Sequence, residues 1–127
     1  MTETASRRSY AAHARSTDTF GRVLCSARDQ HFVVDGPVQN GCPGEAVTPA
    51  ELFLSSVASC GVELVQVFAR QEEVPLRSLS VGISGELDLE DPVRADVTVF
   101  RRVELEFALA GPSAQQAELL VKRFKGR

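Results

Sequence analysis

Three cysteines, Cys25, Cys42 and Cys60, carry the most reactive side chains in this 127-residue chain. An odd number of cysteines without an N-terminal secretory signal argues against a disulfide scaffold. The chain has no CxxC pair and only two histidines, so we expect no zinc site and no other metal site. The remaining roles for these cysteines are burial in a core or chemistry of the free thiol.

Cys60 lies in a segment that predicts a long helix. Thr48 is a favourable N-cap, Pro49 suits the first helical position, and Glu51 completes a capping box with Thr48. The helix should reach about residue 72, because Pro75 prevents its continuation. An apolar stripe follows at steps of three and four residues: Leu52, Phe53, Val57, Cys60, Leu64, Val65 and Phe68.

Two roles for Cys60 follow from this position. Spacing alone favours a core residue, because a cysteine on an apolar stripe is ordinarily buried. The alternative is a nucleophilic thiolate at a buried or half-buried interface. Cys60 is some three turns beyond the start of its helix, so an arginine from elsewhere would have to favour the thiolate.

Small residues dominate the middle of the predicted helix, from position 55 to position 61. Gly61 in a helix interior costs up to about 1 kcal/mol relative to alanine. Because small residues allow another backbone to come close, we predict a tightly crossed helix pair, formed between subunits.

The other elements predict an α+β domain. Residues 8–14 suggest a first strand, residues 20–26 and 30–35 a hairpin, and residues 36–47 a loop rich in glycine and proline. Alternating apolar residues over 79–89 and 97–109 predict an antiparallel sheet covered on one face by helices. Ser113 and Gln116 form a second capping box before a final helix. We expect one domain over residues 1–127, with residues 1–7 disordered.

Composition and charge exclude several classes of protein. Hydrophobic residues make up 43% and charged residues 24%, which is typical of a globular protein. The net charge is −3 and the basic residues form no block, so nucleic acid is not an expected partner. The apolar runs are too short for a membrane span, and we expect the protein in the cytoplasm.

The segment from Thr48 to Cys60 resembles the hallmark helix of the OsmC/Ohr family. That family writes it roughly as Asn or Thr, Pro, Glu, any residue, Leu, then small residues and Cys. The segment from His31 to Pro37 is similar to the strand before the family's glycine-rich loop. The resemblance implies an OsmC-like fold, with antiparallel sheets wrapped around central helices in an intertwined homodimer.

The same resemblance implies a thiol-dependent peroxidase that reduces organic hydroperoxides in oxidative stress defence. The cysteine attacks the hydroperoxide, which gives a sulfenic acid and releases an alcohol. No bound cofactor is expected, since an external dithiol reductant resets the thiol. The implied partners are a second copy of the chain, a hydroperoxide or other small apolar substrate, and the dithiol.

In the family an arginine and a glutamate hold and activate the reactive cysteine. We place the corresponding catalytic site at Cys60, Glu51 and Arg22. Arg15 and Arg28 are the alternative arginines in the same N-terminal region.

The glutamate of this site has two candidates. The family's glutamate directly follows the proline, where this chain has Ala50. Glu51 stands one position later, about 100° further round the helix, and also serves the capping box. Glu45, in the preceding loop, is the second candidate.

The second cysteine of the catalytic cycle also has two candidate positions. In the family it lies in a Cys-Pro pair just after the point that this chain reaches at Arg127. Either the protein lacks that cysteine, or the cysteine lies beyond Arg127 in a longer chain. Cys42-Pro43 is the alternative within the chain. These departures support a second hypothesis, a dimeric OsmC-like protein that binds a small apolar or thiol-bearing molecule without efficient peroxidase turnover.

Overall fold

The computed structural model describes residues 6–96 and 98–126. The chain divides into two compact units, Met1–Leu52 and Phe53–Arg127, which are described separately. The expectation of a single domain stays a prediction. The disorder expected over residues 1–7 falls largely on residues 1–5, which lie outside the described part of the chain.

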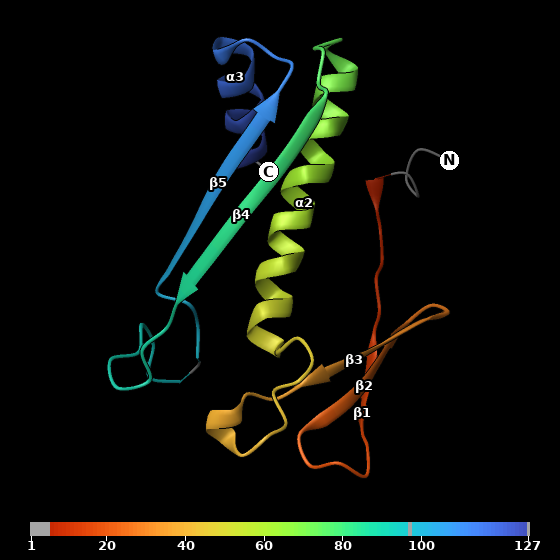
Figure 1. Ribbon diagram of the computed structural model, residues 1–127, viewed down its shortest axis with the longest axis vertical. Coiled ribbons are helices and arrows are strands. Elements are labelled where there is room, and N and C mark those ends of the chain that lie inside the picture. Colours follow the sequence, from red (N-terminus) through yellow and green to blue (C-terminus); the bar gives the residue numbers. More distant parts are fainter. Residues whose placement is uncertain (1–5, 97, 127) are drawn as a thin grey trace. The chain divides into compact units, whose positions relative to one another are not determined.

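The first unit is built on a three-stranded antiparallel sheet in the order β1 (His13–Ser16), β2 (Arg22–Ala27) and β3 (Gln30–Asp35) (Figure 1). The predicted hairpin is confirmed. The first strand was predicted over residues 8–14, which is wrong at both ends, because pairing with β2 begins only where His13 lies opposite Ser26. The β2–β3 turn places Arg28 in the left-handed region, with φ of 54°.

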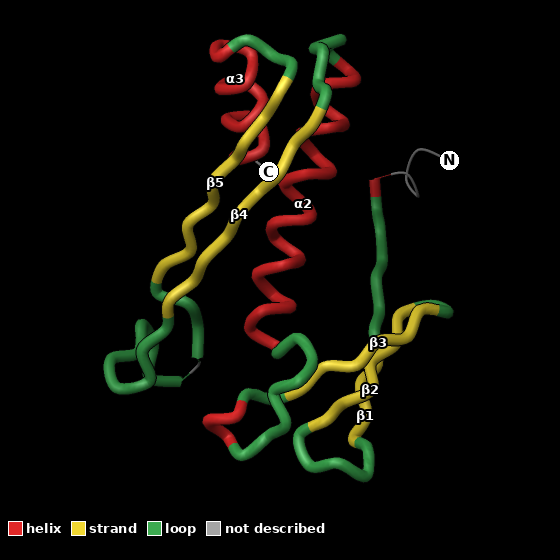
Figure 2. The backbone as a smooth tube through the Cα atoms, viewed as in Figure 1, coloured by secondary structure: helices red, strands yellow, loops and turns green. Residues whose placement is uncertain are grey.

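A loop connects β3 to the long helix and contains the short 3-10 helix η1 (Val38–Asn40) (Figure 2). Backbone hydrogen bonds fasten both ends of this loop. The N–H of Gly36 donates to the carbonyl of Gly21 at 2.8 Å, and the N–H of Asp35 donates to the carbonyl of Val47 at 3.0 Å. The loop is therefore tied to the sheet of the first unit.

Helix α2 (Pro49–Gln71) begins where the capping box predicts. The N–H of Glu51 donates to Thr48 Oγ1 at 3.3 Å, and the N–H of Thr48 donates to Glu51 Oε1 at 3.0 Å. The predicted end near residue 72 is also confirmed. The reciprocal bonds satisfy N–H groups that the first helical turn leaves without intrahelical partners.

The second unit contains most of α2 together with β4 (Ser78–Glu86), β5 (Arg102–Ala110) and α3 (Ala114–Lys125). The strands pair antiparallel from Ser78 opposite Ala110 to Glu86 opposite Arg102. Both strands are shorter than predicted, because the pairing between them ends at Glu86 and Arg102. Residues 87–101 connect the two strands, and Val97 among them lies outside the described residues. The capping box of α3 between Ser113 and Gln116 is confirmed.

Both helices of this unit lie beside the β4–β5 hairpin (Figure 1). The buried core consists of Val65, Phe68 and Ala69 from α2 and Leu120 from α3. Partly buried apolar residues of both strands and of α3 surround it, including Leu79, Phe107, Leu109 and Phe124. The alternating face of the hairpin is thus the one that the helices cover, as predicted.

Helix α2 is apolar over most of its length. Its most apolar 18-residue window has a mean hydropathy of 1.7, so length and composition alone would suffice to cross a membrane. The sequence prediction considered only uninterrupted apolar runs and missed this property. Core helices of soluble proteins share it, and in the second unit α2 contributes Gly61, Val65, Phe68 and Ala69 to the buried interior.

Candidate functional site

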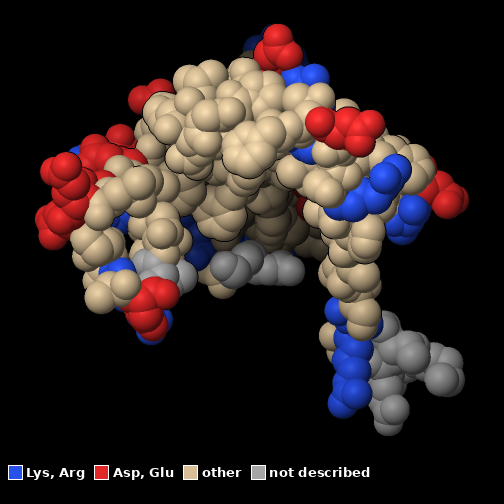
Figure 3. All heavy atoms as spheres, turned by 90° about the horizontal axis from the view of Figure 1, so that it is seen from below, with Lys and Arg blue, Asp and Glu red and all other residues tan. Residues whose placement is uncertain are grey.

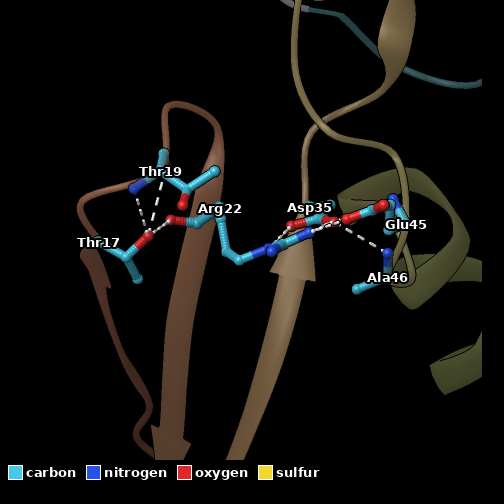
Figure 4. A network of polar contacts seen from close by, with 6 residues as sticks. All are labelled: Thr17, Thr19, Arg22, Asp35, Glu45 and Ala46. Carbon is cyan, nitrogen blue, oxygen red and sulfur yellow. Dashed lines mark hydrogen bonds and ion pairs between the residues drawn. The ribbon is translucent and has the colours of Figure 1, made fainter.

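Arg22 is the best-fixed charged side chain in the first unit. It stands directly opposite Asp35 in the β2–β3 ladder. Its Nε–H donates to Asp35 Oδ1 and an Nη2–H donates to Asp35 Oδ2, each at 2.8 Å (Figure 4). A two-pronged pair of this kind fixes the plane of the guanidinium as well as its position.

Glu45 joins this pair from the loop that precedes α2. A second Nη2–H of Arg22 donates to Glu45 Oε1 at 2.7 Å. The backbone N–H groups of Glu45 and Ala46 both donate to Asp35 Oδ2 at 2.9 Å. Asp35 therefore binds the arginine and the loop at the same time (Figure 4).

The two carboxylates differ in their environments. The Asp35 side chain is completely buried, whereas the Glu45 side chain is 76% exposed and Arg22 is 31% exposed. The hydrogen bonds from Arg22, and then those from Ala46 and Glu45, hold the pKa of Asp35 well below its usual range, although burial opposes this shift. The same pairs raise the pKa of Arg22 above its ordinary value. Asp35 and Arg22 are therefore both ionised at physiological pH.

Cys42 packs against the two glycines that flank this pair in sequence. A Cβ placed on Gly21 would lie 2.5 Å from Cys42 Sγ, and one on Gly36 would lie closer still. Cys42 is half-buried. Two positions without a side chain thus make the space that the Cys42 thiol fills.

Cys60 lies on the exposed side of α2 in the described chain. The core role that spacing alone favours is wrong here, because α2 buries Gly61, Val65, Phe68 and Ala69 instead. The helix has two apolar stripes. The second, which we call the Cys60 stripe, consists of Phe53, Val57, Cys60, Leu64 and Val67.

The Cys60 stripe is only partly covered within the second unit. Phe53 is 52% exposed and Val67 is 37% exposed. Next to the stripe, Ser56 and Ser59 direct their hydroxyls to backbone carbonyls three residues earlier in the same helix. Cys60 is therefore an exposed residue on a partly covered apolar stripe.

The predicted crossing of small residues has a different neighbour in the second unit. A Cβ on Gly61 would lie 3.4 Å from ring atoms of Phe107 and 3.6 Å from Phe124. Gly61 thus faces aromatic side chains of β5 and α3. The predicted pairing between subunits stays a prediction.

Glu51 is engaged at the start of α2. Its Oε1 accepts hydrogen bonds from both the N–H and the hydroxyl of Thr48, at 3.0 and 3.1 Å. These bonds lower the pKa of Glu51. The carboxylate therefore works as a cap, and its catalytic role stays a prediction.

The alternative arginines have no comparable environment. Arg15 is exposed on β1, and Arg28 is exposed in the β2–β3 turn. Cys25 lies half-buried on β2 opposite Phe32. Among the three arginines of this region, only Arg22 has carboxylate partners in the described residues. The pairing of β2 with β3, which sets Arg22 opposite Asp35, is the sequence signal that could have identified Arg22 as the site arginine.

Possible metal ligands do not gather at one place in the described part of the chain. No group of three or more His, Cys, Asp or Glu residues within the described ranges could hold a metal ion. Acidic and basic side chains are both present on the face seen in Figure 3, and uncharged residues form most of it.

A sequence profile described as OsmC-like protein matches residues 42–127 of the chain. No curated protein matches the sequence of this chain. The fold matches an OsmC-like protein from Mycoplasma pneumoniae with a TM-score of 0.80 at 15% identity, over 94% of this chain and 82% of that one.

Two organic hydroperoxide resistance proteins share the fold. The one from Legionella pneumophila has a TM-score of 0.74 at 20% identity, over 94% of this chain and 83% of that one. The one from Elizabethkingia anophelis, with thiocyanate bound, has a TM-score of 0.75 at 14% identity and the same two coverages. At these sequence identities, the likeness to the solved structures shows the fold alone. The profile match covers more than half of the chain and shows the family. This chain therefore belongs to the OsmC-like protein family.

Proposed function

We propose that this protein is a thiol-dependent peroxidase that reduces organic hydroperoxides through Cys60. The observation that carries the proposal is an exposed cysteine on an apolar stripe of α2, within the residues that the family profile matches. The apolar side chains around it suit the organic part of a hydroperoxide better than hydrogen peroxide. The two fold relatives that are organic hydroperoxide resistance proteins support the same substrate class.

The chemistry requires a thiolate and a cation to stabilise it. In the proposed reaction the Cys60 sulfur attacks the outer peroxide oxygen, and the O–O bond breaks. The thiol and ROOH become Cys60–SOH and ROH. A dithiol then reduces the sulfenic acid, which returns Cys60–SH, releases water and leaves the reductant as a disulfide.

Arg22 is the cation that we assign to this reaction, and Glu45 is the carboxylate that accompanies it. Arg22 has a fixed geometry and a side chain that is 31% exposed. Glu45 bonds the guanidinium directly, whereas Glu51 bonds Thr48. This assignment replaces Glu51 by Glu45 as the glutamate partner of the arginine.

We also propose that the protein works as a homodimer in the cytoplasm. Only five hydrophobic residues are buried in the described part of the chain: Val34, Val65, Phe68, Ala69 and Leu120. The Cys60 stripe leaves apolar surface exposed at Phe53 and Val67, although Leu64 packs against the core. A helix that is apolar on two sides needs cover on both, and a second copy would supply it.

One observation favours the alternative of a ligand-binding protein without efficient turnover. Arg22 already pairs with two carboxylates, Asp35 and Glu45, so its positive charge is more than compensated. A cation that is already paired with two carboxylates stabilises a thiolate less than an unpaired cation does. A small apolar or thiol-bearing molecule would then bind at the stripe without rapid oxidation of Cys60.

Hydroperoxide consumption by the reduced protein separates the two functions. We expect the protein to consume one equivalent of cumene hydroperoxide rapidly and to gain a dimedone-reactive sulfenic acid at Cys60. Cys60→Ser should abolish the reaction, while Cys25→Ser, the matched control in β2, should retain it. A Cys60→Ser variant that reacts as fast as the wild type would rule out the peroxidase.

A further inference from the structure

We infer that Phe53 of α2 and Phe100, in the connection between β4 and β5, form a binding subsite for the organic group of the hydroperoxide and thereby favour long apolar chains. The inference rests on the proposed function, because it takes the peroxide to be reduced at Cys60. All of these residues belong to the second unit. The two phenylalanines act on the choice of substrate and take no part in the chemical step.

The rings of Phe53 and Phe100 are stacked. Their centroids lie 5.6 Å apart and their planes are inclined by 23°. Stacking of this kind stabilises a pair beyond the area that it buries and sets the angle between the rings. Phe100 is half-buried, whereas Phe53 is 52% exposed. The pair therefore presents an ordered aromatic surface with Phe53 as its more open member.

Strand β4 provides the space that the Phe100 ring occupies. A Cβ on Gly85 would lie 2.8 Å from two ring atoms of Phe100 and 3.0 Å from Leu54 Cδ2. The Phe100 ring thus lies against the backbone of β4 as well as against the Phe53 ring. A side chain at position 85 would displace Phe100 from this place.

The residue after Phe100 fastens the connection between the strands. The N–H of Arg101 donates to the carbonyl of Glu86 at 2.9 Å, and Arg101 Nη1 donates to Asp91 Oδ2 at 3.2 Å. These bonds hold the base of the connection next to Gly85. Because the aromatic pair is ordered before a substrate arrives, binding costs less conformational entropy.

Phe53 and Cys60 lie on one side of α2. They are seven positions apart, which is nearly two helical turns, so their Cα atoms are separated by about 10 Å along the helix. Val57 lies between them and is half-buried. A substrate whose peroxide oxygen meets the Cys60 sulfur can therefore lay its chain over Val57 and end it at the aromatic pair. The second copy proposed above would close the same surface from outside.

The other end of the Cys60 stripe is less suited to an apolar chain. Leu64 packs against the core of the second unit. Val67 lines a pocket together with the polar side chains of Glu63, Gln66 and Arg70. An apolar chain placed there would remove these polar groups from water without giving them partners. The direction from Cys60 toward Phe53 is therefore the favoured one.

The test compares reagents that share a reacting group and differ in chain length alone. Ethyl and octyl hydroperoxide are the substrates, and N-ethylmaleimide and N-octylmaleimide are non-oxidising probes of the same thiol. An ethyl group ends near Cys60, whereas an octyl chain is long enough to reach Phe53. In the full chain, hydroperoxide consumption is measured, and alkylation is followed on the Cys60 peptide by mass spectrometry. Each variant gives an octyl-to-ethyl ratio of rates for both reactions.

We expect the octyl reagents to react faster than the ethyl ones in the wild type. Phe100→Ala should lower the octyl-to-ethyl ratio about fivefold in both reactions, because the chain loses apolar contact area, while the ethyl rates stay within about twofold. Leu89→Ala, at a 72% exposed apolar position of the same connection, is the matched control and should keep the wild-type ratio. An unchanged ratio in Phe100→Ala, or a ratio lowered only because the ethyl rates rise, would overturn the subsite.

Gly85→Ala tests the subsite without removing an apolar side chain. The added Cβ would overlap ring atoms of Phe100, so the ring must shift and the octyl-to-ethyl ratio should fall. Gly82→Ala, on the same strand with no atom within 4 Å of the added Cβ, should leave the ratio unchanged. A wild-type ratio in Gly85→Ala would contradict the inference. A wild type that consumes no hydroperoxide, but whose preference for N-octylmaleimide depends on Phe100, would overturn the peroxidase and support the subsite.

Discussion

The sulfur of Cys42 fills the space into which a side chain on Gly36 would project. Gly36 directly follows Asp35, and Gly21 on the other side of the sulfur directly precedes Arg22. The thiol is therefore packed beside the backbone of both members of the buried ion pair. Its packing reports whether that pair and the loop after β3 keep their positions.

Gly36→Ala should displace Cys42 and destabilise the first unit. The added methyl group would overlap the sulfur, and overpacking of this kind costs about 1–3 kcal/mol. We expect a lower denaturation midpoint and several-fold faster alkylation of Cys42, measured by denaturant titration and mass spectrometry. Gly82→Ala is the matched control, since no atom lies within 4 Å of a Cβ at that position. Equal alkylation rates in both variants would refute the packing role of Gly36.

Acid should destabilise the protein through Asp35 and Glu51. Both groups have a lowered pKa in the folded chain, Asp35 mainly through the hydrogen bonds of Arg22 and Glu51 mainly through the backbone N–H of Thr48. The unfolded chain then binds more protons than the folded one, so stability falls as the pH falls. The loss should begin as the pH approaches about 4, where unfolded carboxylates protonate, and continue below it.

Denaturant titrations between about pH 6 and about pH 3 measure this loss. Asp35→Asn should be less stable near neutral pH and should lose less stability on acidification than the wild type. Asp29→Asn, in the exposed turn, should follow the wild-type curve. An Asp35→Asn variant with the full acid dependence of the wild type would show that the Arg22 pair does not set it.

Local sequence signals predicted the helices well. The capping boxes at Thr48 and Ser113 place both helix starts, because a capping box involves residues only three positions apart. The alternation over β4 and β5 predicted their pairing and covered face, since every second residue meets the helices. The strands were predicted to extend too far, because apolar residues continue the alternating pattern beyond the end of β4. Leu87 and Leu89 are examples, and in the loop they are 38% and 72% exposed.

The candidate site depended on information that local patterns do not carry. Arg22 meets Asp35 and Glu45 only because β2 and β3 pair in one register and the loop folds back, over separations of 13 and 23 residues. Cys60 shows a second limit. Helix α2 has two neighbouring apolar stripes, the Cys60 stripe and the buried one that includes Val65 and Phe68. The two are shifted by about one residue, so the period of the apolar residues could not predict which stripe the β4–β5 hairpin and α3 would cover.

Gly61→Ala should stabilise the second unit, although the sequence suggested that small residues here serve a close helix crossing. The added Cβ would lie 3.4 Å from Phe107 and 3.6 Å from Phe124, which are ordinary contact distances. Alanine is favoured over glycine in a helix interior by up to about 1 kcal/mol, so we expect a gain of that order in the free energy of unfolding. Urea denaturation measures it.

A larger residue at the same position provides the comparison. Gly61→Leu would push against both rings and should cost about 1–3 kcal/mol. A loss of stability already in Gly61→Ala would mean that another backbone, such as that of a second copy, approaches Gly61 more closely than the rings of Phe107 and Phe124 do.

Glu51→Gln distinguishes a helix cap from a catalytic carboxylate at the start of α2. Glutamine keeps an amide oxygen that can accept the N–H and the hydroxyl of Thr48, so the capping box should survive. We expect a change in the free energy of unfolding below about 0.5 kcal/mol and a peroxide rate within about twofold of the wild type. Thr48→Ala, which removes the cap from the other side, should instead cost about 1 kcal/mol.

The corresponding change in the loop before α2 completes this test. Glu45→Gln removes the charge that pairs with Arg22 at 2.7 Å and should alter the pH dependence of the peroxide reaction, whereas Glu51→Gln should not. The two variants differ by the same atoms, and their carboxylates lie on either side of Thr48 in the sequence, so they serve as controls for each other. A large loss of peroxide turnover in Glu51→Gln with full helix stability would return the catalytic role to Glu51. It would also show that the bond between Arg22 and Glu45 is structural alone.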